Sequence, residues 1–289
     1  MIYTIQNEFL TVGINSLGAE KEFITSNKNV SYLRKRDEYW DSIAPLLFPN
    51  VGRLKEGYTF INNERYELEL HGFARKQEFE VLHQKKDEIT LFNSHSKETL
   101  KHYPFEYKLF VTYTLKNKTL TTKIRIVNHS MKDMQFNYGG HPGFRVPLYD
   151  NERFEDYEIH FEKPETFHSP TVEKDGTLNF DNPHWQFNKL EKLQLDYRYF
   201  TIDAIVIPRV QSNEVSLVNK EGKGIRFSFA DFVSLALWTK PNASFICLEP
   251  WIGYADLYVT DHLFSKKDNI INLEPLKDFT ASYAITILD

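Results

Sequence analysis

A single carboxylate interrupts one of the most apolar segments of the chain, Phe-Ile-Cys-Leu-Glu-Pro-Trp over residues 245–251. In an extended strand, positions 245, 247 and 249 share one face. Glu249 therefore stands where a core strand would carry an apolar residue. Pro250 cannot donate to a sheet ladder, so we expect the strand to end there. A partly buried carboxyl group has a raised pKa and can accept a proton near neutral pH. The alternative is a Glu at the sheet rim, paired with Arg or Lys.

A histidine lies in a second segment of unusual composition, Asn-Tyr-Gly-Gly-His-Pro-Gly-Phe over residues 137–144. Three glycines and a proline surround His141 within five positions, which predicts an irregular backbone. Strained backbone clusters at functional sites. Imidazole is also the side chain whose ordinary pKa lies nearest neutrality. We therefore interpret His141 as a functional residue.

Two further polar residues follow apolar segments at glycines. Arg53 comes directly after Gly52, and a planar guanidinium there suits recognition of hydroxyl or carboxylate groups. A surface Arg in a turn would give the same pattern. His71 follows the predicted strand 66–70 and precedes Gly72, which places it well to face a cleft. A structural histidine is equally compatible with that position.

The elements that must position these residues read as β-strands. Residues 105–115 alternate strictly, with an unbroken apolar face from Phe105 to Leu115, and residues 120–126 continue the pattern after a turn at Asn117. Similar hairpins are predicted for 58–61 with 65–70, 79–82 with 89–92, and 215–219 with 224–229, and a closing strand for 279–288. Many short strands with few helices predict an all-β fold, a large antiparallel β-sandwich.

No linker rich in Pro, Gly or Ser divides the chain, so residues 1–289 are predicted to form one domain. One short helix is expected over 96–103, with Ser96 as its N-cap. Residues 149–197 are polar and rich in Pro and Asn, and we interpret them as long loops on the sandwich. Trp238 lies within an apolar run and is interpreted as a core residue, with packing on a bound ligand as the alternative.

Composition excludes several classes of function. The 35 basic and 40 acidic residues are interspersed, which argues against a nucleic-acid surface. The single cysteine, Cys247, excludes an internal disulfide and a multi-cysteine metal site, and its apolar setting indicates a small buried hydrophobe. The N-terminal residues are not expected to be a signal peptide, and no apolar run is long enough to span a bilayer. We expect a soluble, cytoplasmic protein without a membrane partner.

In their order and spacing, these segments resemble the aldose 1-epimerase (galactose mutarotase) family. The matching positions are Gly52-Arg53, His71-Gly72, the segment 137–144 around His141, and Leu248-Glu249, with a weaker Gly18-Ala19-Glu20 near the start. The resemblance spans nearly the whole chain and is nearest to the LacX-like branch. Pro-Gly-Phe after His141 and Pro-Trp-Ile-Gly after Glu249 depart from the better-known galactose mutarotase pattern, which leaves the preferred sugar open.

The resemblance implies a β-sandwich with a sugar-binding cleft, and interconversion of the α and β anomers of a free aldohexose without a cofactor or metal. It implies Glu249 as general base and His141 as general acid. Arg53 and His71 match residues that hold the sugar, and Asp203, in Phe-Thr-Ile-Asp-Ala, matches an aspartate that binds sugar hydroxyls. Trp251 could pack on the apolar face of the sugar ring. The expected partner is a small monosaccharide. The oligomeric state stays open, with a homodimer as one option.

Three other functions remain to be weighed. A hexose-phosphate 1-epimerase would use the same chemistry and need a cationic patch, for which Arg75, Arg145, Arg209 and Lys240 are available. A non-catalytic carbohydrate-binding protein could share the sandwich, although it would not need both His141 and Glu249. A glycoside hydrolase requires two carboxylates at a defined separation. Glu249 and Asp256 could supply them, but Asp256 follows a Gly-Tyr turn and is expected in a loop.

Overall fold

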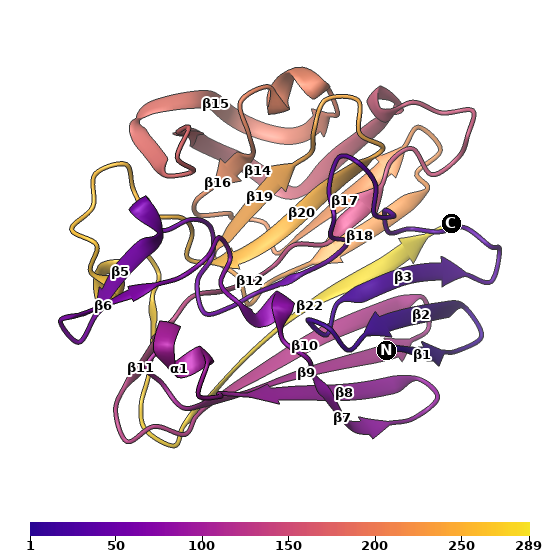
Figure 1. Cartoon of the computed structure of the whole chain (residues 1–289). Helices are drawn as coiled ribbons and strands as arrows, with labels where there is room; N and C mark the ends of the chain where they lie inside the picture. The colour runs from indigo at the N-terminus through magenta and orange to yellow at the C-terminus, as the bar shows by residue number, and fades with distance from the viewer.

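The computed structural model describes residues 1–289 and consists mainly of antiparallel strands in two large sheets (Figure 1). One sheet has nine strands in the order β15-β14-β17-β18-β22-β10-β9-β8-β7. The other has six, in the order β16-β19-β20-β12-β4 with β13 also paired to β20. Apolar side chains from both sheets meet in one cluster of 62 buried residues. The predicted antiparallel β-sandwich is therefore confirmed.

The nine-stranded sheet contains β7 (Glu80–Gln84), β8 (Glu88–Ser94), β9 (Tyr107–Lys116), β10 (Thr119–Asn128), β14 (Tyr157–Val172), β15 (Leu178–Gln194), β17 (Glu214–Asn219), β18 (Gly224–Ser228) and β22 (Asp278–Leu288). The six-stranded sheet contains β4 (Leu46–Leu47), β12 (Tyr138–Gly140), β13 (Gly143–Arg145), β16 (Ile205–Ile207), β19 (Ser234–Trp238) and β20 (Phe245–Ile252). Three small sheets contain β1 (Ile2–Gln6), β2 (Leu10–Asn15) and β3 (Lys21–Ser26); β5 (Tyr58–Ile61) and β6 (Glu64–Glu67); and β11 (Met134–Phe136) and β21 (Ile271–Leu273).

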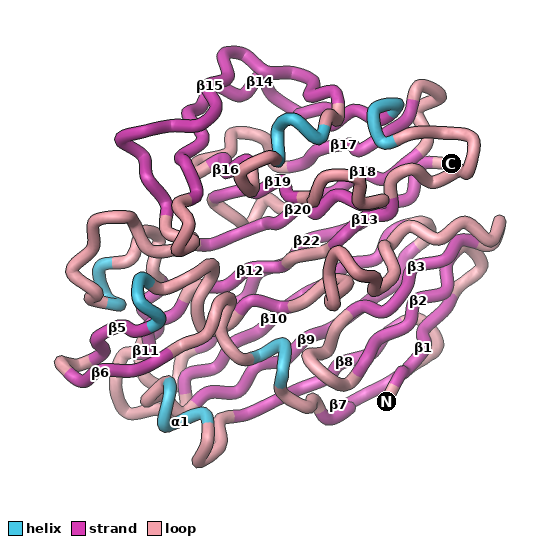
Figure 2. The backbone as a smooth tube through the Cα atoms, turned by 45° about the horizontal axis from the view of Figure 1, so that its top comes forward, coloured by secondary structure: helices cyan, strands magenta, loops and turns pink.

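Helical structure is confined to single turns in the segments between strands (Figure 2). The predicted helix near residue 100 is reduced to one turn, in which Ser96 Oγ accepts the N–H of Thr99. No helix has the length and apolar content needed to cross a membrane. The helical segments are α1 (Thr99–His102), η1 (Lys55–Gly57), η2 (Ala74–Lys76), η3 (Phe154–Asp156), η4 (Tyr197–Phe200) and η5 (Phe264–Lys266).

The predicted hairpin at residues 105–126 forms as β9 and β10. Burial alternates strictly along β9, with Tyr107 and every second residue up to Leu115 in the core. The two strands pair from Lys116 opposite Thr119, and Asn117 in the turn has a φ of 52°, which asparagine tolerates better than most residues. Burying this apolar face in the core stabilises the sandwich by roughly 25 cal/mol per Å² of apolar surface.

The expectation of long loops over residues 149–197 is wrong, because most of this segment forms the long hairpin β14–β15. Its register shifts several times between His160 and Thr171, and its strands contain Pro164, Pro170 and Pro183. Prolines and register shifts interrupt the simple alternation by which strands are recognised. β15 is also an edge strand with mostly exposed side chains, so it carries little apolar signal.

The expectation that a strand ends at Pro250 is also wrong, because β20 continues to Ile252. On one side β20 pairs first with β13, at Cys247 opposite Gly143, and then with β12, at Trp251 opposite Gly139. Pro250 lies at the interval between these two partners. A missing backbone N–H is tolerated there because no neighbouring strand requires it.

The two faces of β20 meet different surroundings, as the alternation predicts. Ile246 and Leu248 belong to the main core between the sheets. Glu249 and Trp251 point to the opposite face, where they line a cavity. The neighbouring strand β19 does the same, with Leu237 in the core and Trp238 on the cavity side. The six-stranded sheet therefore forms the floor of the cavity, and the second sheet supports it from behind.

Candidate active site

A cavity with a volume of about 400 Å³ lies on the outer face of the six-stranded sheet. That volume suits a small ligand. The six residues proposed from the sequence as catalytic or sugar-binding all line it, although they are separated by up to about two hundred positions in the chain: Arg53, His71, His141, Asp203, Glu249 and Trp251. Asp256 does not line this cavity.

Glu249 and His141 are in contact at the floor of the cavity. Oε2 of Glu249 lies 3.0 Å from Nε2 of His141, and the side chains are 2% and 8% exposed. The angle between them does not fit a hydrogen bond, and Oε2 of Glu249 and Nδ1 of His141 both lack a hydrogen-bond partner. Buried polar atoms in proteins are normally satisfied. Both groups are therefore free to bond with a ligand.

Burial acts in opposite directions on the two pKa values. Burial raises the pKa of Glu249 well above its ordinary value, and the nearby Asp203 carboxylate raises it further. Burial lowers the pKa of His141 well below its ordinary value, with His71 and Arg75 as weaker contributors. Both shifts favour the uncharged forms. A single proton held by the pair is thereby shifted toward Glu249.

Tight backbone packing places His141 in the cavity. Its N–H donates to the carbonyl oxygen of Pro45 at 3.0 Å. A Cβ on Gly139 would lie 2.8 Å from the ring of Trp251, and one on Gly140 would lie 2.9 Å from the ring of Tyr283. Neither glycine has a positive φ. The glycines before His141 are therefore required for close approach of the strands, and the expected backbone strain is not found there.

His71 is tied to the Arg53 segment through Gly52. The N–H of Gly52 donates to Nδ1 of His71 at 3.0 Å, and the N–H of His71 donates to the carbonyl oxygen of Gly52 at 2.9 Å. Burial, with Arg75 and Arg53 nearby, lowers the pKa of His71 to about 3. Because Nδ1 accepts a hydrogen bond, the neutral ring carries its proton on Nε2. His71 is thus a hydrogen-bond donor toward the cavity.

Aromatic rings enclose His141. The ring of Trp40 lies 4.6 Å from its ring centroid, and those of His71 and Trp238 lie 5.4 and 5.7 Å away, both edge-on. Trp238 is half-buried and lines the cavity, so its interpretation as a core residue is wrong. The indole N–H of Trp251 is buried and has no hydrogen-bond partner. These rings offer apolar surface and one free donor to a ligand.

Trp40 was not found by reasoning from the sequence. Its segment is held in place by the buried guanidinium of Arg34, which donates to the carbonyl oxygens of Trp40 and Ser42 and forms an ion pair with Asp37. That guanidinium also lies 4.3 Å from the ring centroid of Phe245 on β20. The only sequence signal is a tryptophan within a charged stretch, where a large aromatic residue is not expected.

The turn between β14 and β15 forms the outer wall of the cavity. Glu173, Lys174 and Gly176 line it, although none was singled out in the sequence. A Cβ on Gly176 would lie 3.1 Å from Cδ of Arg53, so the arginine packs against this turn. Opposite, the Asp203 carboxylate accepts the N–H of Ala204 at 2.8 Å. Desolvation by the surrounding protein raises the pKa of Asp203.

Four basic side chains line the cavity, and none forms an ion pair with a carboxylate of this chain: Arg53, Arg75, Lys174 and Lys240. Of the four cations named from the sequence for a sugar phosphate, Arg75 and Lys240 are therefore at the cavity. The other two are not, and Arg145 pairs with Asp150 instead. Nε of Arg75 is buried without a hydrogen-bond partner.

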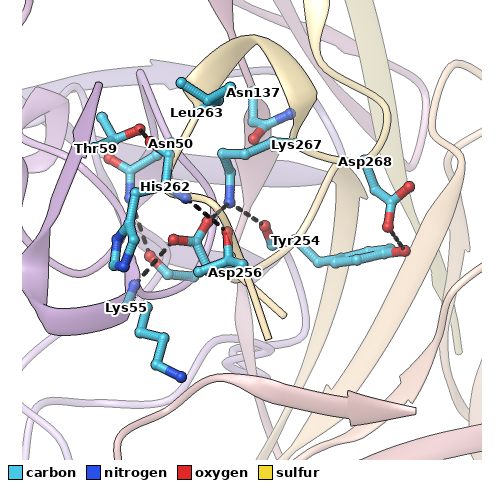
Figure 3. Close-up of polar contacts among 12 residues, drawn as sticks. Asn50, Lys55, Thr59, Asn137, Tyr254, Asp256, His262, Leu263, Lys267 and Asp268 are labelled. Carbon is cyan, nitrogen blue, oxygen red and sulfur yellow. Dashed lines mark hydrogen bonds and ion pairs between the residues drawn. The ribbon is translucent and has the colours of Figure 1, made fainter. Parts of the chain in front are cut away.

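Asp256, the second carboxylate of the glycosidase alternative, lies outside the cavity in a buried ion pair. Its Oδ1 is 2.6 Å from Nζ of Lys267, and its Oδ2 accepts the N–H of Lys55 at 2.9 Å (Figure 3). Both carboxylate oxygens therefore have partners. Since glycosidases need two carboxylates that flank the scissile bond, this arrangement argues against that function.

The fold and the site define a large antiparallel β-sandwich protein with a buried carboxyl–imidazole pair in a polar and aromatic cavity. The chain belongs to the aldose 1-epimerase family, whose sequence profile it matches over residues 1–275. It is 33% identical to the plasmid and chromosomal LacX proteins of Lactococcus lactis subsp. lactis, over the whole length of both chains. The predicted family, including the LacX-like branch, is confirmed.

Solved structures agree with this assignment. A galactose mutarotase related enzyme from Lactobacillus acidophilus is 31% identical, with a TM-score of 0.93 over 100% of this chain and 98% of that chain. A galactose mutarotase-like protein from Lactobacillus casei, 24% identical, gives a TM-score of 0.92 over the whole of both chains and shows the shared fold.

Proposed function

We propose that the protein interconverts the α and β anomers of an aldose, with a free aldohexose as substrate. The observation that carries this proposal is the contact between Glu249 and His141 at the floor of the cavity. One group can exchange a proton with the anomeric hydroxyl and the other with the ring oxygen. Membership of the aldose 1-epimerase family supports the same reaction.

Ring opening requires the ionised form of Glu249 and the protonated form of His141. Glu249 takes the proton of the anomeric hydroxyl while His141 gives its proton to the ring oxygen. The bond between the anomeric carbon and the ring oxygen breaks, and a carbonyl forms. General acid and general base would each contribute roughly 10²–10⁴-fold. Rotation of the aldehyde followed by the reverse proton transfers closes the ring on the other face.

The pKa shifts of Glu249 and His141 fit the second half of this reaction, ring closure. After ring opening, Glu249 carries a proton and His141 is neutral, and burial favours this distribution in the folded protein. The neutral pair matches the open-chain aldehyde, because Glu249 can donate to the carbonyl oxygen while His141 receives the proton of the released hydroxyl. Each half-reaction leaves the pair ready for the other, so no separate step is needed to restore it.

The other cavity residues are proposed to orient the sugar. Nε2–H of His71 and the guanidinium of Arg53 are donors, the carboxylate of Asp203 is an acceptor, and Trp251 supplies an indole face with a free N–H. Fixing the ring against Glu249 and His141 lowers the barrier by positioning.

The unpaired cations favour a second candidate, a hexose-phosphate 1-epimerase. Arg53, Arg75, Lys174 and Lys240 would neutralise a phosphate group without disturbing any existing ion pair. The two candidates differ in one measurement. A sugar phosphate that is epimerised with a KM far below that of the free sugar, and that competes with it, would favour the phosphorylated substrate.

Polarimetry tests the reaction directly. Freshly dissolved α-glucose or α-galactose should reach its equilibrium rotation faster with the protein than in buffer, with EDTA present. Glu249→Gln should lower turnover roughly a hundredfold or more while sugar binding changes little. If no common aldose or aldose phosphate equilibrates faster than in buffer, but sugars bind, the protein is a carbohydrate-binding member of the family.

A further inference from the structure

Asp256 and Lys267 form an ion pair (Figure 3). The pair lies outside the cavity, and its side chains are only 4% and 6% exposed. Besides contacting Asp256 at 2.6 Å, Nζ of Lys267 donates to the carbonyl oxygen of Tyr254 at 3.0 Å. A buried ion pair gains little net stability over an apolar pair of similar volume. Its presence therefore calls for an explanation beyond stability.

Asp256 fixes two segments of the cavity wall at once. Its N–H donates to the carbonyl oxygen of Arg53, and its Oδ2 accepts the N–H of Lys55, each at 2.9 Å. Its own carbonyl oxygen accepts the N–H of Leu178, the first residue of β15, also at 2.9 Å. One residue thus joins the Arg53 segment to the base of the β14–β15 hairpin.

The side chain of Arg53 packs against the second of these segments, at the β14–β15 turn. Its own backbone is held by Asp256, and the turn against which it packs, at Gly176, lies two residues before Leu178. Gly52 adds a close contact, because a Cβ there would lie 2.6 Å from the backbone of Ala255. Gly52 in turn exchanges two hydrogen bonds with His71. The positions of Arg53 and His71 are therefore both set relative to the segment 255–256.

We infer that Asp256, held by Lys267, is a positioning residue that fixes Arg53 and His71 for sugar binding. It touches no ligand itself, since both its oxygens are occupied and it lies outside the cavity. The inference rests on the proposed function for the role of Arg53. An exposed guanidinium on an untethered loop would have to be ordered when the sugar binds, and that ordering weakens binding. The buried pair orders it beforehand.

The test compares Asp256→Asn with Glu165→Gln. Glu165 is a matched control because its carboxylate is 1% exposed, accepts the N–H groups of Gln211 and Ser212, and does not line the cavity. Both variants should lower Tm. Only Asp256→Asn should raise KM, roughly tenfold, with kcat changed by no more than about threefold. Lys267→Met should act in the same direction and serves if the first variant does not fold.

A double-mutant cycle with Arg53→Ala separates positioning from general loss of stability. In the Arg53→Ala background, Asp256→Asn should raise KM by a smaller factor than in the wild type, because only His71 remains of the two groups that it positions. Equal effects of Asp256→Asn in both backgrounds, or equal effects of Asp256→Asn and Glu165→Gln on KM, would overturn the inference.

Hydrogen exchange gives a readout that does not depend on turnover. Asp256→Asn should speed exchange at the amides of Lys55 and Leu178, whereas Glu165→Gln should leave both unchanged. If the wild-type protein epimerises no sugar, the proposed function fails, but this comparison still decides whether Asp256 orders the cavity wall. Unchanged protection at both amides in Asp256→Asn would refute that ordering.

Discussion

Nε2 of His141 lies 3.0 Å from Oε2 of Glu249, yet the two groups share no well-formed hydrogen bond and almost no solvent reaches either one. Both are held in a setting that disfavours their charged forms, as the raised pKa of Glu249 and the lowered pKa of His141 indicate. This arrangement should cost stability and support catalysis, and the two effects can be measured separately.

Glu249→Gln should raise Tm at neutral pH. In the unfolded chain a Glu ionises with a pKa of about 4.3, whereas the folded pKa of Glu249 is higher. As the pH rises above about 4.3, the unfolded state releases its proton first, so the folded wild type loses stability that the Gln variant keeps. The difference in Tm, variant minus wild type, should grow between pH 4.5 and 7. Each kcal/mol of difference in the free energy of unfolding corresponds to roughly 2–4 °C in Tm.

Glu69→Gln is the control for this prediction. Its carboxylate is largely exposed, and the Lys76 ion pair lowers the pKa of Glu69. The wild-type carboxylate contributes stability at higher pH in this case, so the Tm difference should be small and opposite in sign. A Tm of Glu249→Gln that stays below that of the wild type over the whole range would show that ionised Glu249 stabilises the fold.

The rate of epimerisation should follow a bell-shaped pH dependence with a wide plateau. The active pair holds one proton in total. A second proton must go to His141, whose pKa is lowered, so activity falls only well on the acid side of its ordinary range. The remaining proton leaves Glu249. Because the pKa of Glu249 is raised, the alkaline limb of the profile moves to higher pH. Both limbs belong to the coupled pair. Measuring kcat from pH 4 to 10 tests this, and a narrow optimum below pH 5 would contradict it.

His141→Asn and His71→Asn should differ kinetically. In His71→Asn the amide oxygen can still accept the N–H of Gly52, so the Arg53 segment keeps its shape and only the Nε2–H donor is lost. We expect that variant to act partly through KM. His141→Asn removes the proposed acid and should lower kcat by roughly 10²-fold or more. The roles must be exchanged if His71→Asn abolishes kcat while His141→Asn leaves it intact.

Trp40→Leu should weaken sugar binding by roughly three- to tenfold, since it removes the ring that lies on His141 and lines the cavity. Trp40→Phe should restore most of the affinity. Trp185→Leu is the matched control, because Trp185 lies in β15 away from the cavity, where its indole N–H donates to the carbonyl oxygen of Tyr199. Equal KM changes for Trp40→Leu and Trp185→Leu would exclude a specific role for Trp40.

The parts of this structure that follow from local pattern could be predicted from the sequence. The alternation from Tyr107 to Leu115 forms β9, and Glu249 and His141 stand out because residues of their type do not belong in such apolar or glycine-rich segments. Trp40 and Lys174 could not be predicted in the same way. Trp40 is held by Arg34, which packs on the distant Phe245, and Lys174 lies in the β14–β15 turn, which packs against the distant Arg53.

Predictions from neighbouring residues in the sequence also failed where a distant strand decides the local structure. Pro250 reads as a strand end, but β20 continues because its neighbour changes from β13 to β12 at that point. The glycines before His141 read as irregular backbone, whereas they are strand residues that lack space for a side chain beside Trp251 and Tyr283. In both cases the decisive neighbour is about a hundred or more positions away in the chain.

Three of the four tryptophans, Trp40, Trp238 and Trp251, line the cavity, and Trp185 is the only one elsewhere. Their emission should therefore respond to any ligand that displaces water from the indole rings. A fluorescence titration of the unmodified protein would rank sugars and sugar phosphates by affinity even where no turnover occurs. The same optical signal could be followed in a stopped-flow instrument, so that arrival of the sugar is timed separately from its epimerisation.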